Sequence, residues 1–149
     1  MPKIVRELFE NYVKEKFDLQ DCVAVNNGTS ALIAPLWSMD LNSEDEVITT
    51  PFTFIATTNA ILIAGAKPVF VDIDPNTLLI DVNKIEEKIT KNTKAIIAVH
   101  LYGRICDMKK INEIAKKYNL IVIDPPWNVK KINSHRRHFS GIWGDNTLW

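Results

Sequence analysis

The sequence predicts an α/β fold with a mostly parallel sheet and helices on both faces, which makes three layers. Short apolar runs alternate along the chain with segments of helical periodicity. The runs at residues 68–73 and 95–99 are rich in β-branched residues and largely apolar. Strands of this kind are buried on both faces, which is typical of a parallel sheet between helical layers.

The first elements are expected between residues 22 and 39. Residues 22–25 form a short apolar run that is typical of a strand. Residues 29–39 have helical character, and Thr29 or Ser30 is placed to cap the start of that helix. Pro35 falls inside the helix, where a proline costs roughly 3 kcal/mol or kinks the element.

A strand, a helix and a second strand follow. Residues 47–48, close to two threonines and closed by Pro51, predict the first of these strands. Residues 53–64 are almost entirely apolar or small and predict a helix buried on most sides, which Gly65 ends. Residues 68–73 form the second strand.

The second half of the chain adds two helices and two strands. Asp81 is placed to cap a helix with three apolar residues on its inner face: Val82, Ile85 and Ile89. Residues 95–99 predict a buried strand. Asp107 starts the clearest helix, whose apolar face opposes lysines and consists of Met108, Ile111, Ile114, Ala115 and Tyr118. Residues 120–123 predict the last strand, which ends on Asp124.

Composition and charge narrow the function classes. The chain has 149 residues, 46% of them hydrophobic, with 18 basic residues against 18 acidic ones. This balance gives no electrostatic reason to bind nucleic acid or an anionic membrane, and no apolar stretch is long enough to span a bilayer. Cys22 and Cys106 are isolated and are expected to be buried, reduced thiols. With no apolar export signal at the start, we expect a cytoplasmic protein.

Residues at the carboxyl ends of the strands are the candidates for a site, because ligands bind there in parallel sheets. Gly28, Thr29 and Ser30 open a helix, where backbone N–H groups and hydroxyls can hold an anion. This pattern predicts a phosphate cup, although a plain turn and helix cap explains it equally well. His100 follows a strand and could act as a general acid or base. We favour the alternative of a partly buried histidine with satisfied hydrogen bonds.

Several motifs share their order and spacing with one enzyme family. They are NGTSAL at 27–32, DEVI at 45–48, PFTFIAT at 51–57, GAKPVFVDID at 65–74, TKAII at 93–97 and VHLYG at 99–103. Together they resemble the nucleotide-sugar aminotransferases of DegT/StrS type, which depend on pyridoxal 5'-phosphate and have fold type I. The match runs from about Val5 to Ile123 and resumes weakly at residues 140–145.

The resemblance implies roles for matching residues in the large-domain core of such an enzyme. Gly28, Thr29 and Ser30 would hold the cofactor phosphate, and Phe54 would stack on the pyridine ring. Asp124 would pair with the pyridine nitrogen and keep it protonated, which makes the ring an electron sink. The alternatives are a core aromatic for Phe54 and a cap for Asp124. We expect these groups to converge on one pocket.

The family pattern fails after the last strand. An acidic residue followed by Asp-Ala-Ala-Gln or -His is expected there, whereas this chain has Asp124-Pro125-Pro126-Trp127-Asn128. Strict register places Pro125 on the pyridine-binding position, and only a one-residue deletion returns Asp124 to it. A compensated frameshift or a locally decayed gene would produce the divergent stretch, and the coding DNA would test this hypothesis.

The basic stretch from Lys130 to Arg137 is interpreted as a solvated loop rather than a nucleic-acid patch. His135 and His138 lack a third ligand, so no metal site is expected. The lysine that would hold the cofactor as a Schiff base is also absent. We therefore expect a truncated large domain with an N-terminal helix (1–19), an α/β core (20–124) and a divergent tail (125–149).

Two functional hypotheses follow from the resemblance. The first is an aminotransferase that moves an amino group from an amino acid to a nucleotide-linked keto-sugar and works as a homodimer. Relatives that dehydrate sugars use the same scaffold, and the sequence does not separate the two chemistries. The second hypothesis is a truncated or decayed non-catalytic homologue that folds and at most binds phosphate or a partner subunit.

Overall fold

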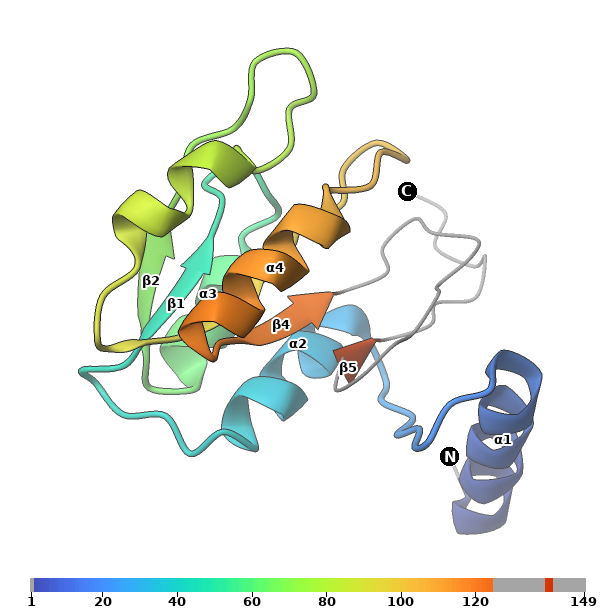
Figure 1. Ribbon diagram of the computed structural model, residues 1–149. Coiled ribbons are helices and arrows are strands. Elements are labelled where there is room, and N and C mark those ends of the chain that lie inside the picture. The colour runs from blue at the N-terminus through green and yellow to red at the C-terminus, as the bar shows by residue number, and fades with distance from the viewer. Residues whose placement is uncertain (1, 125–138, 141–149) are drawn as a thin grey trace.

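The computed structural model describes residues 2–124 and 139–140 (Figure 1). In chain order the elements are α1 (Lys3–Phe17), α2 (Gly28–Trp37), β1 (Glu46–Thr49), α3 (Ala56–Ile63), β2 (Lys67–Phe70), the 3₁₀ turns η1 (Val82–Lys84) and η2 (Glu86–Lys88), β3 (Thr93–Ile97), α4 (Met108–Tyr118), β4 (Ile121–Asp124) and β5 (Phe139–Ser140). The predicted tail at residues 125–149 lies outside the described residues except for β5.

The described strands form one parallel sheet in the order β2-β1-β3-β4-β5. A parallel pair needs a crossover connection. Helix α3 provides it between β1 and β2, and α4 provides it between β3 and β4. The predicted parallel α/β architecture is therefore confirmed.

Alternation along the strands divides the core into two layers. Ile48, Ile96 and Val122 point to one face of the sheet and pack with α4. Their neighbours Val47, Ala95 and Ile123 point to the other face and pack with α2 and α3. The sheet thus lies between two helical layers, as predicted, and we call its two sides the α4 face and the α2–α3 face.

The strand expected at residues 22–25 is absent, which corrects the sequence-based prediction. Residues 18–27 form an irregular connection between α1 and α2. Val23 is 77% exposed, and the Ala24 N–H donates to the Glu10 carboxylate over 2.8 Å instead of to a neighbouring strand. Cys22 is consequently only partly buried, whereas Cys106 is buried as expected.

Helix α2 starts one residue earlier than predicted, and Asn27 caps it. The Asn27 side chain accepts a hydrogen bond from the Ser30 N–H over 2.8 Å, while its own backbone is extended. Thr29 and Ser30 are therefore in the first turn and are not the cap. Pro35 does lie inside α2, as predicted, but only two residues before the helix ends at Trp37.

Helix α3 is shorter and less buried than its composition suggests. It spans Ala56–Ile63, and its buried residues are Ala56, Thr57, Ala60 and Ile61. Leu62 and Ile63 are 55% and 53% exposed. Helix α3 covers the sheet with one side only. The expectation that this helix is buried on most sides is therefore wrong for the part of the chain that the structure describes.

The segment after β2 forms two 3₁₀ turns instead of the predicted helix. Asp81 still caps the first turn, since its carboxylate accepts from the Asn83 N–H over 3.0 Å. Ile85 is fully buried, and Val82 and Ile89 pack beside it against the α4-face core, so the predicted apolar side exists without a full helix.

Helix α4 matches its prediction closely. Asp107 caps it by accepting from the Lys110 N–H over 3.1 Å, and Ile111, Ile114 and Ala115 are buried. Tyr118 is instead 38% exposed, because its hydroxyl reaches the Glu86 carboxylate.

Candidate functional site

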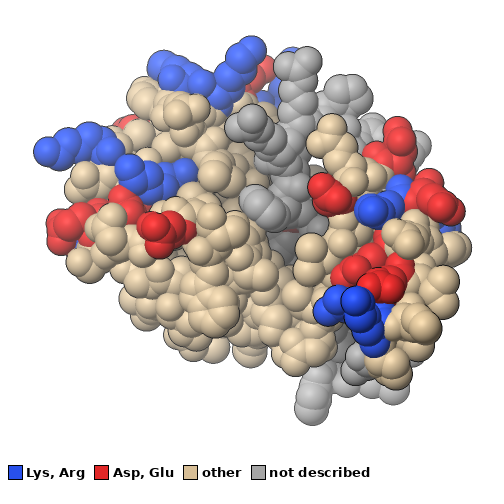
Figure 2. All heavy atoms as spheres, turned by 90° about the horizontal axis from the view of Figure 1, so that it is seen from below, with Lys and Arg blue, Asp and Glu red and all other residues tan. Residues whose placement is uncertain are grey.

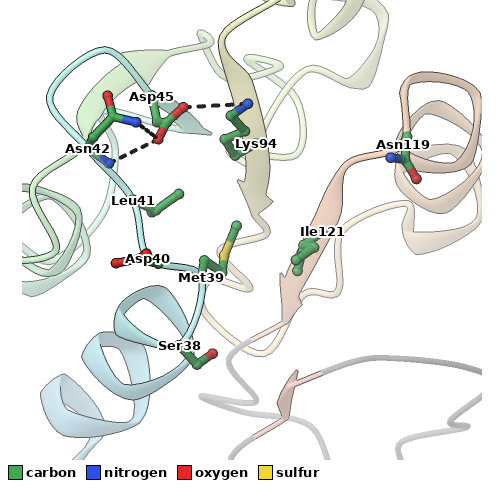
Figure 3. Close-up of a pocket in the computed structure, with 9 residues that line it drawn as sticks. All are labelled: Ser38, Met39, Asp40, Leu41, Asn42, Asp45, Lys94, Asn119 and Ile121. Atoms are coloured by element: carbon green, nitrogen blue, oxygen red, sulfur yellow. Dashed lines mark hydrogen bonds and ion pairs between the residues drawn. The ribbon is translucent and has the colours of Figure 1, made fainter.

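The two edges of the sheet carry different features. A pocket of about 580 Å³ lies at the amino edge, where Ser38 follows α2, Lys94 is the second residue of β3 and Ile121 begins β4 (Figure 3). An ion pair of 3.5 Å between Lys94 and Asp45 closes one side of it. This pocket is on the opposite edge from every residue that the sequence predicted for the cofactor.

The direction of α2 relative to the sheet follows from the position of Ser38, the residue after its last turn. A ten-residue helix is about 15 Å long, and the strands are of similar length. Since α2 ends at the amino edge and packs along the sheet through Leu32 and Leu36, its start is directed towards the carboxyl edge. Gly28, Thr29 and Ser30 are thus placed where a parallel sheet binds ligands.

The first turn of α2 has donors available for an anion. Gly28 is buried, and Thr29 and Ser30 are half-buried. The Ser30 N–H is already bonded to Asn27, and the Ser30 hydroxyl bonds to the Asn26 side chain over 2.8 Å. Among the described residues, no partner bonds to the N–H groups of Gly28 and Thr29, and no acidic residue lies in this turn. These two amides and the Thr29 hydroxyl can therefore receive a phosphate.

Phe54 projects from the loop that follows β1. Its side chain is 76% exposed, which excludes a core position within the described part of the chain. The loop is fixed at its far end, because the Thr57 N–H donates to the Phe54 carbonyl and the Thr53 and Thr57 hydroxyls are 3.0 Å apart. Stacking of this ring on the cofactor stays a prediction.

His100 and Asp124 form a buried contact at the carboxyl ends of β3 and β4. His100 Nε2 lies 2.6 Å from Asp124 Oδ1, and the histidine side chain is 2% exposed. His100 Nδ1 accepts a hydrogen bond from the Cys106 N–H over 3.1 Å. A neutral imidazole that accepts at Nδ1 carries its proton on Nε2, so that proton faces the carboxylate.

The contact is short, but its direction is not that of a well-aligned hydrogen bond. Asp124 Oδ1 is buried and has no aligned donor among the described residues. The charge of Asp124 also reaches Cys106: burial, and then this carboxylate, raise the pKa of the Cys106 thiol to about 12. Histidine, cysteine and aspartate therefore form one buried polar cluster.

The structure brings His100 and Asp124 together, but not on the same face of the sheet as α2. Cys106 belongs to the α4-face core, and Val122, two residues before Asp124, does too. Gly28, Thr29 and Ser30 begin a helix on the α2–α3 face. Convergence of Asp124 with the phosphate cup thus stays a prediction. The expectation that His100 is a histidine with partners agrees with its contacts.

Sequence reasoning expected Tyr102 to border the site, but it missed the turn at Tyr102 and the role of Asn27 as the helix cap. Asparagine directly before Gly-Thr-Ser is a strong capping signal and could have identified Asn27. Tyr102 and Gly103 both have positive φ, 53° and 76°, in a two-residue turn between Leu101 and Arg104. Only the backbone geometry reveals this turn, because tyrosine rarely adopts such a conformation.

Two kinds of feature are absent from the described part of the chain. Residues 2–124 and 139–140 contain no group of three His, Cys, Asp or Glu side chains that could hold a metal ion. Within the same residues, none of the helices is both apolar and long enough to cross a bilayer. The basic stretch and its two histidines, between Lys130 and His138, lie outside the described residues.

Comparisons with known proteins identify the family. Residues 5–125 match the model of the DegT/DnrJ/EryC1/StrS aminotransferase family. The chain is 51% identical over 116 residues to dTDP-3-amino-3,6-dideoxy-alpha-D-galactopyranose transaminase of Aneurinibacillus thermoaerophilus, and the matched segment covers 78% of this chain and 31% of that protein. It is 48% identical over 116 residues to GDP-perosamine synthase of Escherichia coli O157:H7, and this match covers 78% of this chain and 32% of that protein.

A solved structure agrees with these relatives. NtdA from Bacillus subtilis with bound cofactor PMP superimposes with a TM-score of 0.75 and 44% identity, over 79% of this chain and 27% of that one. The chain thus spans about a third or less of the length of the relatives it matches. Family, fold and sequence agree: this chain belongs to the DegT/DnrJ/EryC1/StrS aminotransferase family, whose cofactor is pyridoxal phosphate.

Proposed function

We propose that this chain provides the cofactor-binding core of an aminotransferase that acts on a nucleotide-linked keto-sugar. The observation that supports it most directly is the open first turn of α2, where the N–H groups of Gly28 and Thr29 have no bonding partner among the described residues. The names of two relatives, a dTDP-sugar transaminase and a GDP-perosamine synthase, support a nucleotide-sugar substrate.

The residues present fit the phosphate end of the cofactor. A dianionic phosphate is stabilised by amide donors at the positive end of a helix dipole, and Thr29 adds a hydroxyl. Ser30 is less available, because both its N–H and its hydroxyl are already bonded to asparagines. In this proposal Gly28 and Thr29 are therefore the main ligands of the cofactor phosphate, and Ser30 stabilises the conformation of the turn.

Once bound, pyridoxal phosphate supplies an electron sink for amino transfer. The chain's own residues bind its phosphate and orient it. Phe54, on the loop after β1, would cover one side of the ring and exclude water there. The chemistry also needs an amine that forms the Schiff base, and the resemblance assigns this role to no lysine among the described residues.

A homodimer is part of the same proposal. Trp37 on α2 is 63% exposed, and Leu62 and Ile63 on α3 are more than half exposed. Apolar side chains gathered on one surface favour association, so a second copy is the expected partner.

A second candidate is a non-catalytic homologue that folds and binds phosphate or a partner subunit. The contact of Asp124 with His100 favours it, because this carboxylate is already engaged within the chain. The two candidates differ in whether a cofactor is held covalently.

Titration with pyridoxal phosphate, followed by absorbance, tests the proposal. We expect saturable binding that Thr29→Ala weakens about tenfold, since one charge-assisted hydrogen bond is lost. The control is Thr58→Ala, because Thr58 is a half-buried threonine in α3 whose hydroxyl has no hydrogen bond among the described residues. Equal affinity of wild type and Thr29→Ala would overturn the phosphate cup.

Borohydride reduction separates the two candidates. A band that reduction fixes to one lysine, located by peptide mass spectrometry, would exclude the non-catalytic candidate. Binding that is saturable but leaves no lysine modified would support it.

A further inference from the structure

Asp124 is directed towards the α4 face of the sheet. Side chains alternate along a strand, and in β4 Val122 joins the α4-face core while Ile123 joins the α2–α3 core. Asp124 continues this alternation and contacts His100, whose other ring nitrogen accepts from Cys106 of the α4-face core. The carboxylate is thus engaged on the face opposite the helix that carries the phosphate cup.

The segment that His100 begins returns on itself. The N–H and carbonyl groups of Leu101 and Arg104 bond to each other, over 3.2 and 2.9 Å, around Tyr102 and Gly103. A two-residue turn with positive φ at both central positions is a type I′ hairpin, which favours Asn-Gly or Asp-Gly. Here a tyrosine occupies the first position, and its side chain is 75% exposed. We call residues 100–106 the Tyr102 hairpin.

Both sides of the Tyr102 hairpin are tied to the rest of the molecule. His100, at its start, links the Cys106 N–H at its end to Asp124 of β4. Arg104 Nη1 donates to the carbonyls of Asn76 and Thr77, over 3.2 and 3.0 Å. The strained turn is therefore held from two neighbouring segments of the carboxyl edge, and an exposed phenol is presented there.

We infer that Asp124 is a positioning residue, which orients His100 and so holds the Tyr102 hairpin at the carboxyl edge, and is not the partner of the cofactor's pyridine nitrogen. The inference deepens the proposed function and rests on it only for the cofactor. In this inference the phosphate cup anchors the cofactor, and Asp124 has a structural role within the chain. This role also agrees with the strict register of the family resemblance, which places Pro125 and not Asp124 on the pyridine-binding position.

The amide of Cys106 reports directly on this arrangement. Its N–H bonds to the His100 ring, so its hydrogen exchange depends on how the ring is oriented. We expect Asp124→Asn and His100→Gln each to accelerate exchange at Cys106 about tenfold, beyond any change at the Ile48 amide, which reports on global opening. The control Glu113→Gln removes one carboxylate on the exposed side of α4 and should change neither amide.

Binding of pyridoxamine 5'-phosphate to the full chain provides the second measurement. Asp124→Asn should leave the affinity unchanged, whereas Thr29→Ala should weaken it. Unchanged protection of Cys106 in Asp124→Asn would overturn the inference, and so would a loss of affinity in this variant that His100→Gln does not share. Absence of binding in the wild type would refute the proposed function alone, because the exchange result decides the positioning role separately.

The ring of His100 offers a test that needs no variant. Nitrogen-15 NMR of the wild-type chain should show the tautomer with the proton on Nε2, which faces Asp124. The opposite tautomer would overturn the inference even if both variants failed to fold.

Discussion

The two helical layers of this molecule differ in how their outer surfaces are made. Helix α4 buries Ile111, Ile114 and Ala115 and turns its charged residues outwards. Lys117 and Tyr118 on it also bond to Glu86 of η2, over 2.8 and 2.9 Å. The outer side of α4 is therefore a polar surface that water can solvate.

Helices α2 and α3 contain no charged residue at all. Their inner sides fill the core beneath the sheet, yet Trp37, Leu62 and Ile63 remain more than half exposed. Figure 2 accordingly shows a broad area without Lys, Arg, Asp or Glu between the charged groups at the left and those at the right. Burial of one side of a helix thus gives a layer with a solvated outer surface only when the other side of the helix is polar.

Substitutions in the α4 layer should have the largest effect on stability. Ile111 is fully buried, so we expect Ile111→Ala to lower the free energy of unfolding by about 3 kcal/mol in urea denaturation. The same change at the exposed Ile63 should cost less than about 0.5 kcal/mol. Similar costs at both positions would mean that Ile63 is buried in solution.

High pH should destabilise the α4 layer through Cys106. Its folded-state pKa is raised from 9.0 to about 12, so the stability it contributes is present below pH 9 and is lost as pH rises towards 12. In Cys106→Val the free energy of unfolding should fall less over this pH range, by an amount on the order of 2 kcal/mol. Cys22→Ala is the matched control, and a decline as steep in Cys106→Val as in the wild type would contradict the prediction.

Removal of the helix caps should cost about 1 kcal/mol in either layer. Asp107→Ala removes the acceptor for the Lys110 N–H of α4, and Asn27→Ala removes the acceptor for the Ser30 N–H of α2. Thermal denaturation measures both. Because the Asn27 cap also shapes the phosphate cup, only Asn27→Ala should weaken phosphate binding as well.

Charges on α3 should leave stability nearly unchanged and alter self-association instead. Leu62→Glu with Ile63→Glu should change the free energy of unfolding by less than about 0.5 kcal/mol. Sedimentation velocity should show less association than in the wild type. An unchanged sedimentation profile would exclude these two residues from the interface between copies.

Much of the fold could be predicted because it depends on local pattern. The alternation of apolar strands with helices indicated a parallel sheet, and the period of α4 with Asp107 at its start identified that helix. The motif at Asn27-Gly28-Thr29 indicated a helix start, and the structure has a helix that begins at Gly28. Each of these follows from contacts between residues close in the sequence.

Residues that depend on a distant partner could not be predicted in the same way. The apolar run at 22–25 resembles a strand, but a strand needs a neighbour, and Glu10 takes its backbone donor at Ala24 instead. The contact of Asp124 with His100, which lies 24 residues earlier in the chain, could not be read from the sequence either, and the pairing of Asp124 with the cofactor stays a prediction.

The sequence by itself determined the class of fold, the family and the helix start that suits a phosphate, because these are encoded in local periodicity and in motif order. Only the tertiary structure decided on which face of the sheet each polar side chain lies. In a strand that choice changes with every single residue, so the assignment of Asp124 depends on which neighbours the sheet brings to it.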